Sequence, residues 1–390
     1  MLSKKNLLSI FVLFLGWFLI LHLFIYTGLN RAVFEKDTSY DAIFTLPKLL
    51  LEGPPLANLW QRWDSHWYLG IADHGYYYKP GEQSSVAFFP LYPLAIRFVA
   101  TLTHLNSSLV GVLLSILFTF ASCFYLFLLA KQLWNNEETG IRSVLFLLIF
   151  PVSFFLLSIY TESLFLLLSI ASFYYAHTKR WGVAIACAIL LTATRFTGIL
   201  IVLPLLLLYT EQHWGSFKQF FRPVLLGILC IPLGLLLFSA HLWVTYKDPL
   251  LFLKSQKQWF RTTNITPKGL TESYKKYVSD FKHVSKAATP LPVATRLIDI
   301  GFTLLFIILT VAAWFILPRT HALFSTFLCI VPLLTGTFQS MPRFALSAFP
   351  LFLVLGKITQ KTIPFFLISF LFTLFLGLLS LLYVNFYWIA

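Results

Sequence analysis

The sequence predicts an all-α, polytopic membrane protein built around a bundle of about eleven transmembrane helices. Two observations lead to this prediction. Of the 390 residues, 58% are hydrophobic and only 11% are charged, whereas soluble domains carry roughly 25% charged residues. The apolar residues also gather in long runs that short polar segments separate. Because backbone polar groups must be satisfied within a bilayer, such runs are expected to form helices.

The expected spans follow one another along nearly the whole chain. The first run comes after Lys4 and Lys5, and it exceeds the roughly 7–15 apolar residues of a signal peptide, so we expect a retained first helix. Later runs end at polar or basic breaks. The expected helices cover about 7–29, 109–133, 142–158, 162–177, 181–194, 197–209, 224–246, 297–317, 321–338, 344–357 and 362–385.

Basic residues in the breaks indicate the orientation. With a cytosolic N-terminus, the cytosolic segments between helices are rich in Lys and Arg. The only basic residues in the short outer segments are Arg195 and Arg343. This asymmetry follows the positive-inside rule and puts the C-terminus outside. The net charge of +14 therefore indicates orientation and contact with membrane lipids, and it does not indicate nucleic acid binding.

Two long polar segments are expected on the outer side of a single integral membrane domain, 1–390. They are the first outer loop, about 30–108, and the second, about 247–296. The most hydrophilic part of the second, 254–286, is open to two interpretations: a mobile loop or a surface helix on lipid headgroups. The four cysteines lie within apolar runs without metal-binding spacing, so neither zinc nor a disulfide framework is indicated.

Several expected spans hold only about 13–17 residues, against about 20 for a full crossing. They pair into hairpins with outward turns at 160–163, 194–197 and 339–343. Such turns would lie below the outer surface, where non-helical backbone is tolerated only beside protein or a water-filled cavity. Glu162, Arg195 and Arg343 are therefore expected to share one cavity that opens outward. Ordinary interfacial turns would give the same pattern.

The first outer loop holds the densest polar cluster, from Arg62 to Tyr76 (RWDSHWYLGIADHGY). Apolar residues at helical spacing predict an amphipathic surface helix over 63–72, and Asp73 with His74 marks its end. Two carboxylates and two histidines suit acid–base chemistry or a divalent cation. Equally, Asp64 could cap the surface helix. The next segment, 87–93, holds two prolines and is expected to return to the membrane as an apolar strap.

These motifs resemble the PIG-V family of mannosyltransferases. The string from Arg62 to Tyr76, followed by AFFPLYP at 87–93, is similar to the first luminal loop of the family. The YTES, RFTG and QSMPRF strings resemble its Tyr-x-Glu-Ser, Arg-x-x-Gly and Gln-x-x-Pro-Arg-Phe/Tyr elements; they begin at Tyr160, Arg195 and Gln339. Segment 248–259 matches more weakly. The matches follow the family's order.

The resemblance implies a GT-C type glycosyltransferase. Such an enzyme transfers a sugar, here expected to be mannose, from a polyprenyl-phosphate donor to a lipid or glycan acceptor on the outer face, with inversion. It implies that Asp64 is the catalytic base. The length of the chain favours a bacterial homologue in the cytoplasmic membrane over an enzyme of the endoplasmic reticulum.

Physical chemistry is compatible with these roles. One carboxylate takes the proton of the acceptor hydroxyl, and arginines suit the phosphate of the leaving group. Arg343 and Arg195 are the leading phosphate ligands, with Arg62 behind them, although Arg195 could instead form a salt bridge with Glu162. Further substrate contacts are expected from the polar side chains Gln339, Glu162, Asp73 and His74. A divalent cation is an open alternative for Asp73 and His74, and no other cofactor is indicated.

A second class of function competes with the enzyme. A transporter or flippase of a lipid-linked anion would also need cations at membrane depth. Transporters typically show paired broken helices in two related halves, with a site near the midplane. Here the polar groups gather on the outer side, and the first outer loop carries acid–base residues. This distribution favours the glycosyltransferase.

Overall fold

The computed structural model describes residues 3–28, 54–213, 223–259, 261–262, 265–284, 291–385, 387 and 389. Within these residues the ordered elements are all helical. The prediction of an all-α polytopic membrane protein is therefore confirmed. The early part of the first outer loop, 29–53, lies outside the described residues, as does 285–290 of the second.

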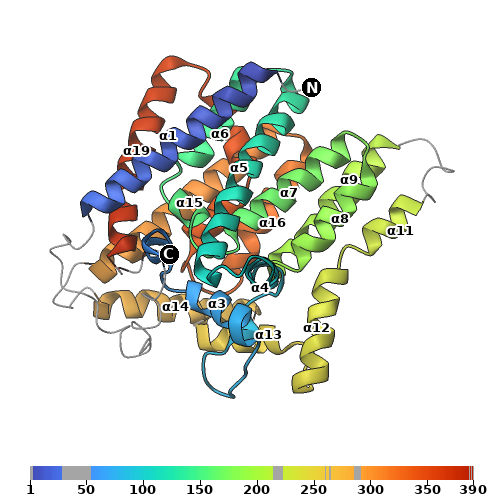
Figure 1. Ribbon diagram of the computed structural model, residues 1–390, viewed down its shortest axis with the longest axis vertical. Coiled ribbons are helices and arrows are strands. Elements are labelled where there is room, and N and C mark those ends of the chain that lie inside the picture. Colours follow the sequence, from blue (N-terminus) through green and yellow to red (C-terminus); the bar gives the residue numbers. More distant parts are fainter. Residues whose placement is uncertain are drawn as a thin grey trace.

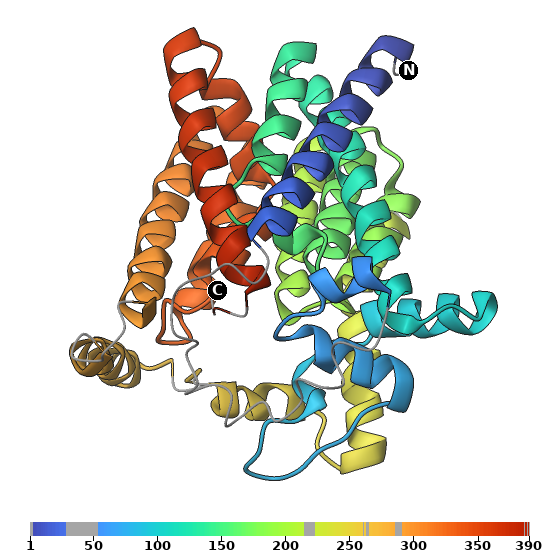
Figure 2. The same ribbon diagram turned by 60° about the vertical axis from the view of Figure 1, so that its left-hand side comes forward.

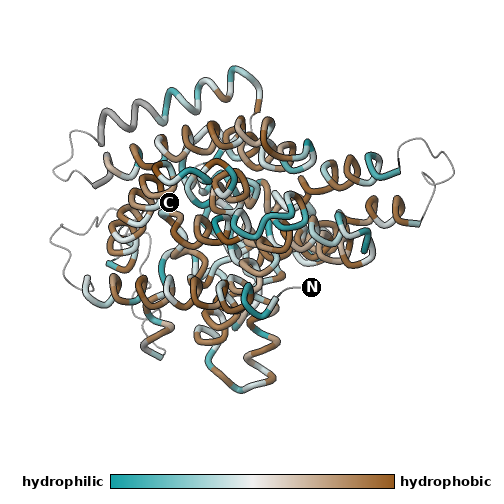
Figure 3. The backbone as a smooth tube through the Cα atoms, turned by 90° about the horizontal axis from the view of Figure 1, so that it is seen from above, coloured by the Kyte–Doolittle hydropathy of each residue, from teal (hydrophilic) through white to brown (hydrophobic). Residues whose placement is uncertain are grey.

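Long apolar helices form one side of the bundle. Among the described residues, four helices are long and apolar enough to cross a membrane, or up to six if two bent pairs are each counted as one span. The long helices are α1 (Lys4–Gly28), α5 (Ser107–Trp134), α15 (Leu291–Ile316) and α19 (Thr362–Val384). Hydrophobic residues cover much of the bundle (Figure 3), and large ones such as Phe315 and Ile363 are exposed on its outside. Lipid chains would cover such faces.

Shorter helices build the centre of the bundle and account for the remaining expected spans. Figure 1 shows α7 between α5 and α8. Twelve of the 16 residues of α7 are buried, so this helix is surrounded mainly by protein. The short helices are α6 (Glu137–Leu148), α7 (Glu162–His177), α8 (Trp181–Thr192), η4 (Phe196–Ile201), α9 (Val202–Gln212) and α16 (Arg319–Leu333).

Prolines interrupt three of the expected spans. The helix expected over 142–158 stops at Leu148, three residues before Pro151, and continues only as η3 (Ser153–Leu156). Proline lacks the backbone N–H that would continue a helix. The other two spans become bent pairs: α11 (Pro223–Leu229) with α12 (Leu233–Tyr246), at 41°, and α17 (Met341–Ser347) with α18 (Pro350–Ile358), at 78°.

A layer of short helices lies against the end of the bundle opposite the N-terminus (Figure 2). The amphipathic α14 has the surface-helix form considered for the second outer loop. The layer comprises α2 (Pro55–Trp60), α3 (Ser65–His74), η2 (Ser85–Ala87), α4 (Leu91–Thr103), α13 (Leu251–Lys254), η5 (Ser255–Trp259) and α14 (Pro267–Val284).

The expectation of an apolar strap over 87–93 is wrong. A helix, α4, begins at Leu91, with Pro90 just before it and Pro93 in its first turn. Prolines are tolerated there because the first N–H groups of a helix have no partner within the helix. Helix α4 extends sideways from the bundle (Figure 2), and Phe98 and Leu102 on it are exposed. This geometry suits a helix lying in the membrane interface.

Candidate active site

Arg343 joins two carboxylates at the end of the bundle that faces the outer layer. Its Nη1 donates to Oδ2 of Asp64 at 2.8 Å, and its Nε donates to Oε1 of Glu162 at 2.8 Å. The flat face of the guanidinium lies 4.5 Å from the ring centre of Tyr160. Only 8% of the Arg343 side chain is exposed. Arg343 therefore joins three segments that are far apart in the sequence: the first outer loop, the start of α7, and α17.

Glu162 lies at the first position of α7 and is completely buried. Its Oε1 also accepts from Nη2 of Arg195 at 2.7 Å, so one oxygen holds two guanidinium groups. Its other oxygen, Oε2, has no hydrogen-bond partner. The start of a helix favours a negative charge because the dipole of the helix is positive there. Glu162 thus fixes the spacing of Arg195 and Arg343. The salt bridge considered between Arg195 and Glu162 is present.

Arg195 is held from both sides. Its Nη1 donates to Oγ of Ser347 at 3.0 Å, and this hydroxyl donates to the carbonyl of Arg343 at 3.1 Å. Gly198 closes the turn by donating its N–H to the carbonyl of Arg195 at 2.9 Å. A Cβ on Gly198 would lie 2.4 Å from the carbonyl oxygen of Leu191. Only glycine therefore allows this turn to pack so closely on α8.

Asp64 precedes α3 and points toward Arg343. Its side chain makes no capping bond to the helix, so the interpretation of Asp64 as a helix cap is wrong. Tyr160 fixes the backbone here: its hydroxyl accepts from the N–H of Asp64 and donates to the carbonyl of Arg62, both at 3.1 Å. The preceding Trp63 has φ of 51°, which is unusual for a bulky residue. With 13% of its side chain exposed, Asp64 is accessible to a small reactant.

The structure gives Arg62 a different position from the other arginines. Its guanidinium donates to backbone carbonyls: to Val384 at 3.1 Å, to Gln61 at 3.1 Å, and to Asn58. These bonds tie α2 and the loop before Asp64 to the end of α19. Arg62 thus supports the backbone of the site.

Asp73, His74 and Gln339 are not joined to this cluster by their side chains. Asp73 and His74 end α3, about 14 Å along the helix axis from Asp64. Oδ1 of Asp73 accepts from Oγ of Ser107 at 2.5 Å. Gln339 lies in the turn before α17, and its backbone carbonyl accepts from Nη2 of Arg261 at 3.4 Å. Among the described residues, no group of three His, Cys, Asp or Glu side chains could hold a metal ion.

The sequence reasoning missed Arg261. This residue follows η5 in the second outer loop, and its guanidinium carbon lies 5.3 Å from the ring centre of Phe344, next to Arg343. Its Nη1 donates to Oγ1 of Thr335 at 3.1 Å. Stretch 254–286 is crowded with cations, so its composition could not have singled out this one.

Aromatic residues join the two outer loops beside the site. Trp67 stacks on Phe88 with ring centres 5.6 Å apart and meets Trp259 edge-on at 5.3 Å. Burial lowers the pKa of His66 below its ordinary value of 6.5, and burial raises the pKa of Tyr68 to about 12. Both side chains are therefore neutral near pH 7 and add no charge to the cluster.

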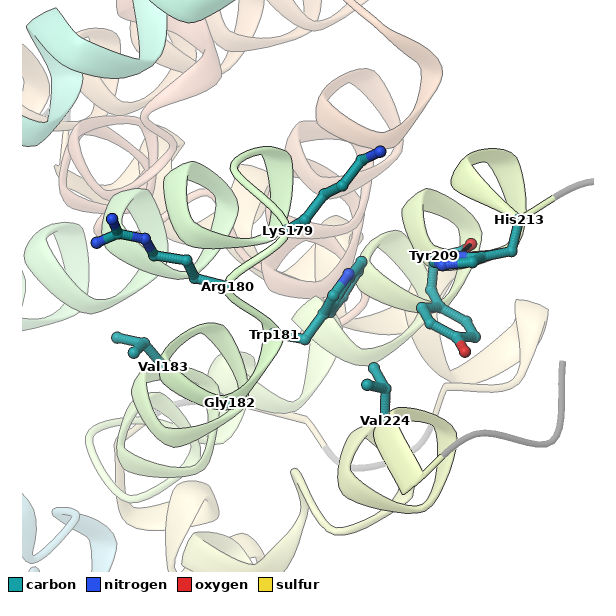
Figure 4. Close-up of a pocket in the computed structure, with 8 residues that line it drawn as sticks. All are labelled: Lys179, Arg180, Trp181, Gly182, Val183, Tyr209, His213 and Val224. Carbon is teal, nitrogen blue, oxygen red and sulfur yellow. Dashed lines mark hydrogen bonds between the residues drawn. The ribbon is translucent and has the colours of Figure 1, made fainter. Parts of the chain in front are cut away.

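A cavity of about 520 Å³ lies elsewhere in the molecule (Figure 4). Its lining includes Lys179, Arg180, Trp181 and Tyr209, with the indole of Trp181 edge-on to Tyr209. It opens just beyond the far end of α7, about 24 Å along that helix from Glu162. No carboxylate lines it. The cavity is therefore separate from the Asp64 cluster, and His213 is the residue of its lining that could act as a base.

Comparisons with known proteins agree with the motifs of the first outer loop and of the turns at Tyr160 and Arg195. Residues 11–248 match the family described as Mannosyltransferase (PIG-V). GPI mannosyltransferase 2 from Drosophila pseudoobscura pseudoobscura is 29% identical over 114 residues, which cover 27% of this chain and 24% of that protein. The chain thus aligns with about a quarter of this curated relative. Because the family match covers more than half of the sequence, the chain belongs to the PIG-V family of mannosyltransferases.

Proposed function

We propose that the protein transfers mannose from a polyprenyl-phosphate-linked donor to a hydroxyl of a lipid or glycan acceptor, with inversion at the anomeric carbon. The observation that carries this proposal is the bridge from Arg343 to Asp64 and Glu162, which puts a cation of the type that suits phosphate beside a partly exposed carboxylate. Membership of the PIG-V family supports the sugar.

Asp64 would act as the general base. It takes the proton of the acceptor hydroxyl while the acceptor oxygen forms a bond to the anomeric carbon. The bond from that carbon to the phosphate oxygen breaks, and polyprenyl phosphate leaves with the electron pair. Glu162 is completely buried and holds two arginines, so it is not available as a second, nucleophilic carboxylate. One accessible carboxylate suits single displacement with inversion.

Arg343 and Arg195 would hold the donor phosphate. Charge-assisted hydrogen bonds from a guanidinium strengthen as negative charge grows on the leaving oxygen. Nη1 of Arg343 donates to Oδ2 of Asp64. A phosphate that competes for this Nη1 would free the carboxylate to meet the acceptor. Donor binding would then activate the base before the acceptor reacts.

We infer that the reaction takes place on the outer face of a bacterial cytoplasmic membrane. Asp64 directly precedes α3, which belongs to the layer at the end of the bundle opposite the N-terminus, and the positive-inside rule predicts a cytosolic N-terminus. We assign no metal to the mechanism, because the ligand considered, Asp73, lies at the far end of α3 from Asp64.

One observation favours the alternative, a transporter or flippase of a lipid-linked anion. The bent pairs α11–α12 and α17–α18 resemble the broken helices that line many transport sites. In this chain, however, the charged cluster lies at one end of the bundle, at the first residue of α7, and not near its middle.

The test uses purified full-length protein in liposomes with polyprenyl-phosphate mannose as donor. An alkyl mannoside and a bacterial lipid extract serve as acceptors, and guanosine diphosphate mannose serves as a control donor. We expect transfer of mannose and release of polyprenyl phosphate from the lipid donor alone. Movement of intact donor across the bilayer without any transfer would overturn the proposal and support the transporter.

A further inference from the structure

Arg261 is a half-buried cation whose hydrogen-bond partners are neutral. Its guanidinium donates to Oγ1 of Thr335 at 3.1 Å and to the carbonyl of Gln339 at 3.4 Å. Over the described part of the chain, no carboxylate oxygen lies within 4.0 Å of it, the distance of an ion pair. By contrast, Arg195 and Arg343 each contact a carboxylate. Taking a charge partly out of water without a paired opposite charge is unfavourable, so such a cation calls for an explanation.

The position of Arg261 links it to the other two arginines. Its guanidinium carbon lies 5.3 Å from the ring centre of Phe344, and that of Arg195 lies 6.0 Å from the same ring. Phe344 directly follows Arg343 in α17. The guanidinium groups of Arg195 and Arg261, from two separate segments, therefore both lie close to the ring of the residue that follows Arg343. Contacts with an aromatic ring stabilise a cation without neutralising its charge.

The charges in this region leave an excess of positive charge. Three arginines face two carboxylates, Asp64 and Glu162. Asp299 of α15 also attracts Arg261, but Arg296 shares this interaction with Asp299.

Burial and the like charge of Arg343 lower the pKa of Arg261 to about 10. Arg261 therefore stays charged at neutral pH. An anion bound here would relieve the repulsion between Arg261 and Arg343.

We propose that Arg261 is a third ligand of the donor phosphate, supplied by the second outer loop. The proposal rests on the proposed function, because it takes the phosphate of a polyprenyl-phosphate sugar as the anion. Arg343 and Arg195 bind this phosphate from the bundle, and Arg261 binds it from the outer layer. The same ligand would hold the polyprenyl phosphate that leaves after transfer. Arg261 would therefore contribute to binding of both donor and product.

Binding of polyprenyl phosphate tests this role without any need for turnover. We compare wild type with Arg261→Gln and Arg261→Lys in detergent, by displacement of a fluorescent polyprenyl phosphate. Loss of a charge-assisted hydrogen bond should weaken binding about 10- to 100-fold in Arg261→Gln. Arg261→Lys should bind with intermediate affinity, because lysine keeps the charge but loses the planar pair of donors. The KM for the donor should rise in parallel.

Two matched variants separate binding from structure. Lys257→Gln removes an exposed cation from the same loop and should leave the affinity within twofold of wild type. Thr335→Val removes a neutral partner of Arg261 and keeps its charge; it should lower the melting temperature and weaken binding less than Arg261→Gln does. If Arg261→Gln does not fold, Arg261→Lys decides the question by the same readout: an affinity equal to that of wild type overturns the role of Arg261.

The outcomes keep the two proposals apart. If wild type turns over the donor and folded Arg261→Gln binds polyprenyl phosphate as tightly as wild type, the role of Arg261 is overturned and the proposed function stands. If wild type neither binds polyprenyl phosphate nor transfers mannose, the proposed function fails. Vesicles of phosphatidylglycerol test a second source of phosphate: if Arg261→Gln weakens binding to these vesicles and not to polyprenyl phosphate, Arg261 contacts bulk lipid, and the proposal is wrong.

Discussion

Nη1 of Arg343 lies 2.8 Å from Oδ2 of Asp64, although 279 positions separate the two residues in the sequence. The contact pairs the proposed base with a proposed phosphate ligand. The same guanidinium reaches Glu162 through Nε, so the position of Asp64 depends on a buried carboxylate in another helix. The predictions below follow from this arrangement.

Arg343 and Glu162 should behave as a coupled pair in stability. Arg343→Gln leaves two carboxylates without this partner, and breaking a buried pair destabilises by about 3–5 kcal/mol. Glu162→Gln should be destabilising for the same reason. The double variant Arg343→Gln/Glu162→Gln should be more stable than the sum of the two changes predicts, because the loss of the contact between Arg343 and Glu162 is then counted only once. Thermal unfolding in detergent measures the four proteins. Additive losses would contradict the coupling.

Arg62 should contribute to the stability of the fold and not to binding of the donor. Arg62→Met leaves buried carbonyls of Val384 and Gln61 without their donor, which destabilises by about 1–3 kcal/mol for each group. The melting temperature should fall while the folded fraction keeps a donor KM close to that of wild type. A raised KM at unchanged melting temperature would instead make Arg62 a substrate ligand.

Gly198→Ala should displace Arg195. The added Cβ would meet the backbone of Leu191 at 2.4 Å, and the turn that holds Arg195 must open. We expect lower stability and a loss of donor affinity that resembles the loss in Arg195→Gln. Gly182→Ala is the matched control, since a Cβ there meets no atom within 4 Å. Equal behaviour of the two alanine variants would show that the close approach at Gly198 is unimportant.

His66 should make the protein less stable in mild acid. Its pKa is lowered, mainly by burial, so the unfolded chain binds a proton more readily than the folded one. The contribution of His66 to the free energy of unfolding is therefore complete above about pH 6.5, and it is lost as the pH falls toward the lower pKa of the folded state. His66→Gln should show a smaller drop in melting temperature between pH 7.5 and pH 5.5 than wild type. An identical drop in the two proteins would exclude His66 as a source of the loss of stability in acid.

The order and approximate ends of the helices could be predicted because hydropathy is a local property. The helix expected over 109–133, for example, runs from Ser107 to Trp134. Helix α4 was missed because its prolines indicate either a strap or a helix start, and only the packing of Leu91 onward decides between them. The 78° bend before Pro350 was missed for the same reason, because only the packing of the helices decides whether a proline ends a helix or begins one.

The sequence allowed Glu162, Arg195 and Arg343 to be grouped, because short hairpins bring their turns to one depth. The direction of the Asp64 side chain could not be predicted, since it depends on a partner 279 positions away. Arg261 was hidden for a related reason: only tertiary packing against Phe344 distinguishes it from the other cations of its loop.

The central claim is that Asp64 takes the proton of the acceptor. Asp64→Asn preserves the shape of the side chain and leaves an oxygen that can accept from Arg343, so folding and binding of polyprenyl phosphate should persist. The most direct measurement is the kcat of mannose transfer by purified Asp64→Asn, with saturating polyprenyl-phosphate mannose. Loss of a general base should lower kcat about 10²- to 10⁴-fold. A folded Asp64→Asn protein with a kcat within threefold of wild type would contradict the account.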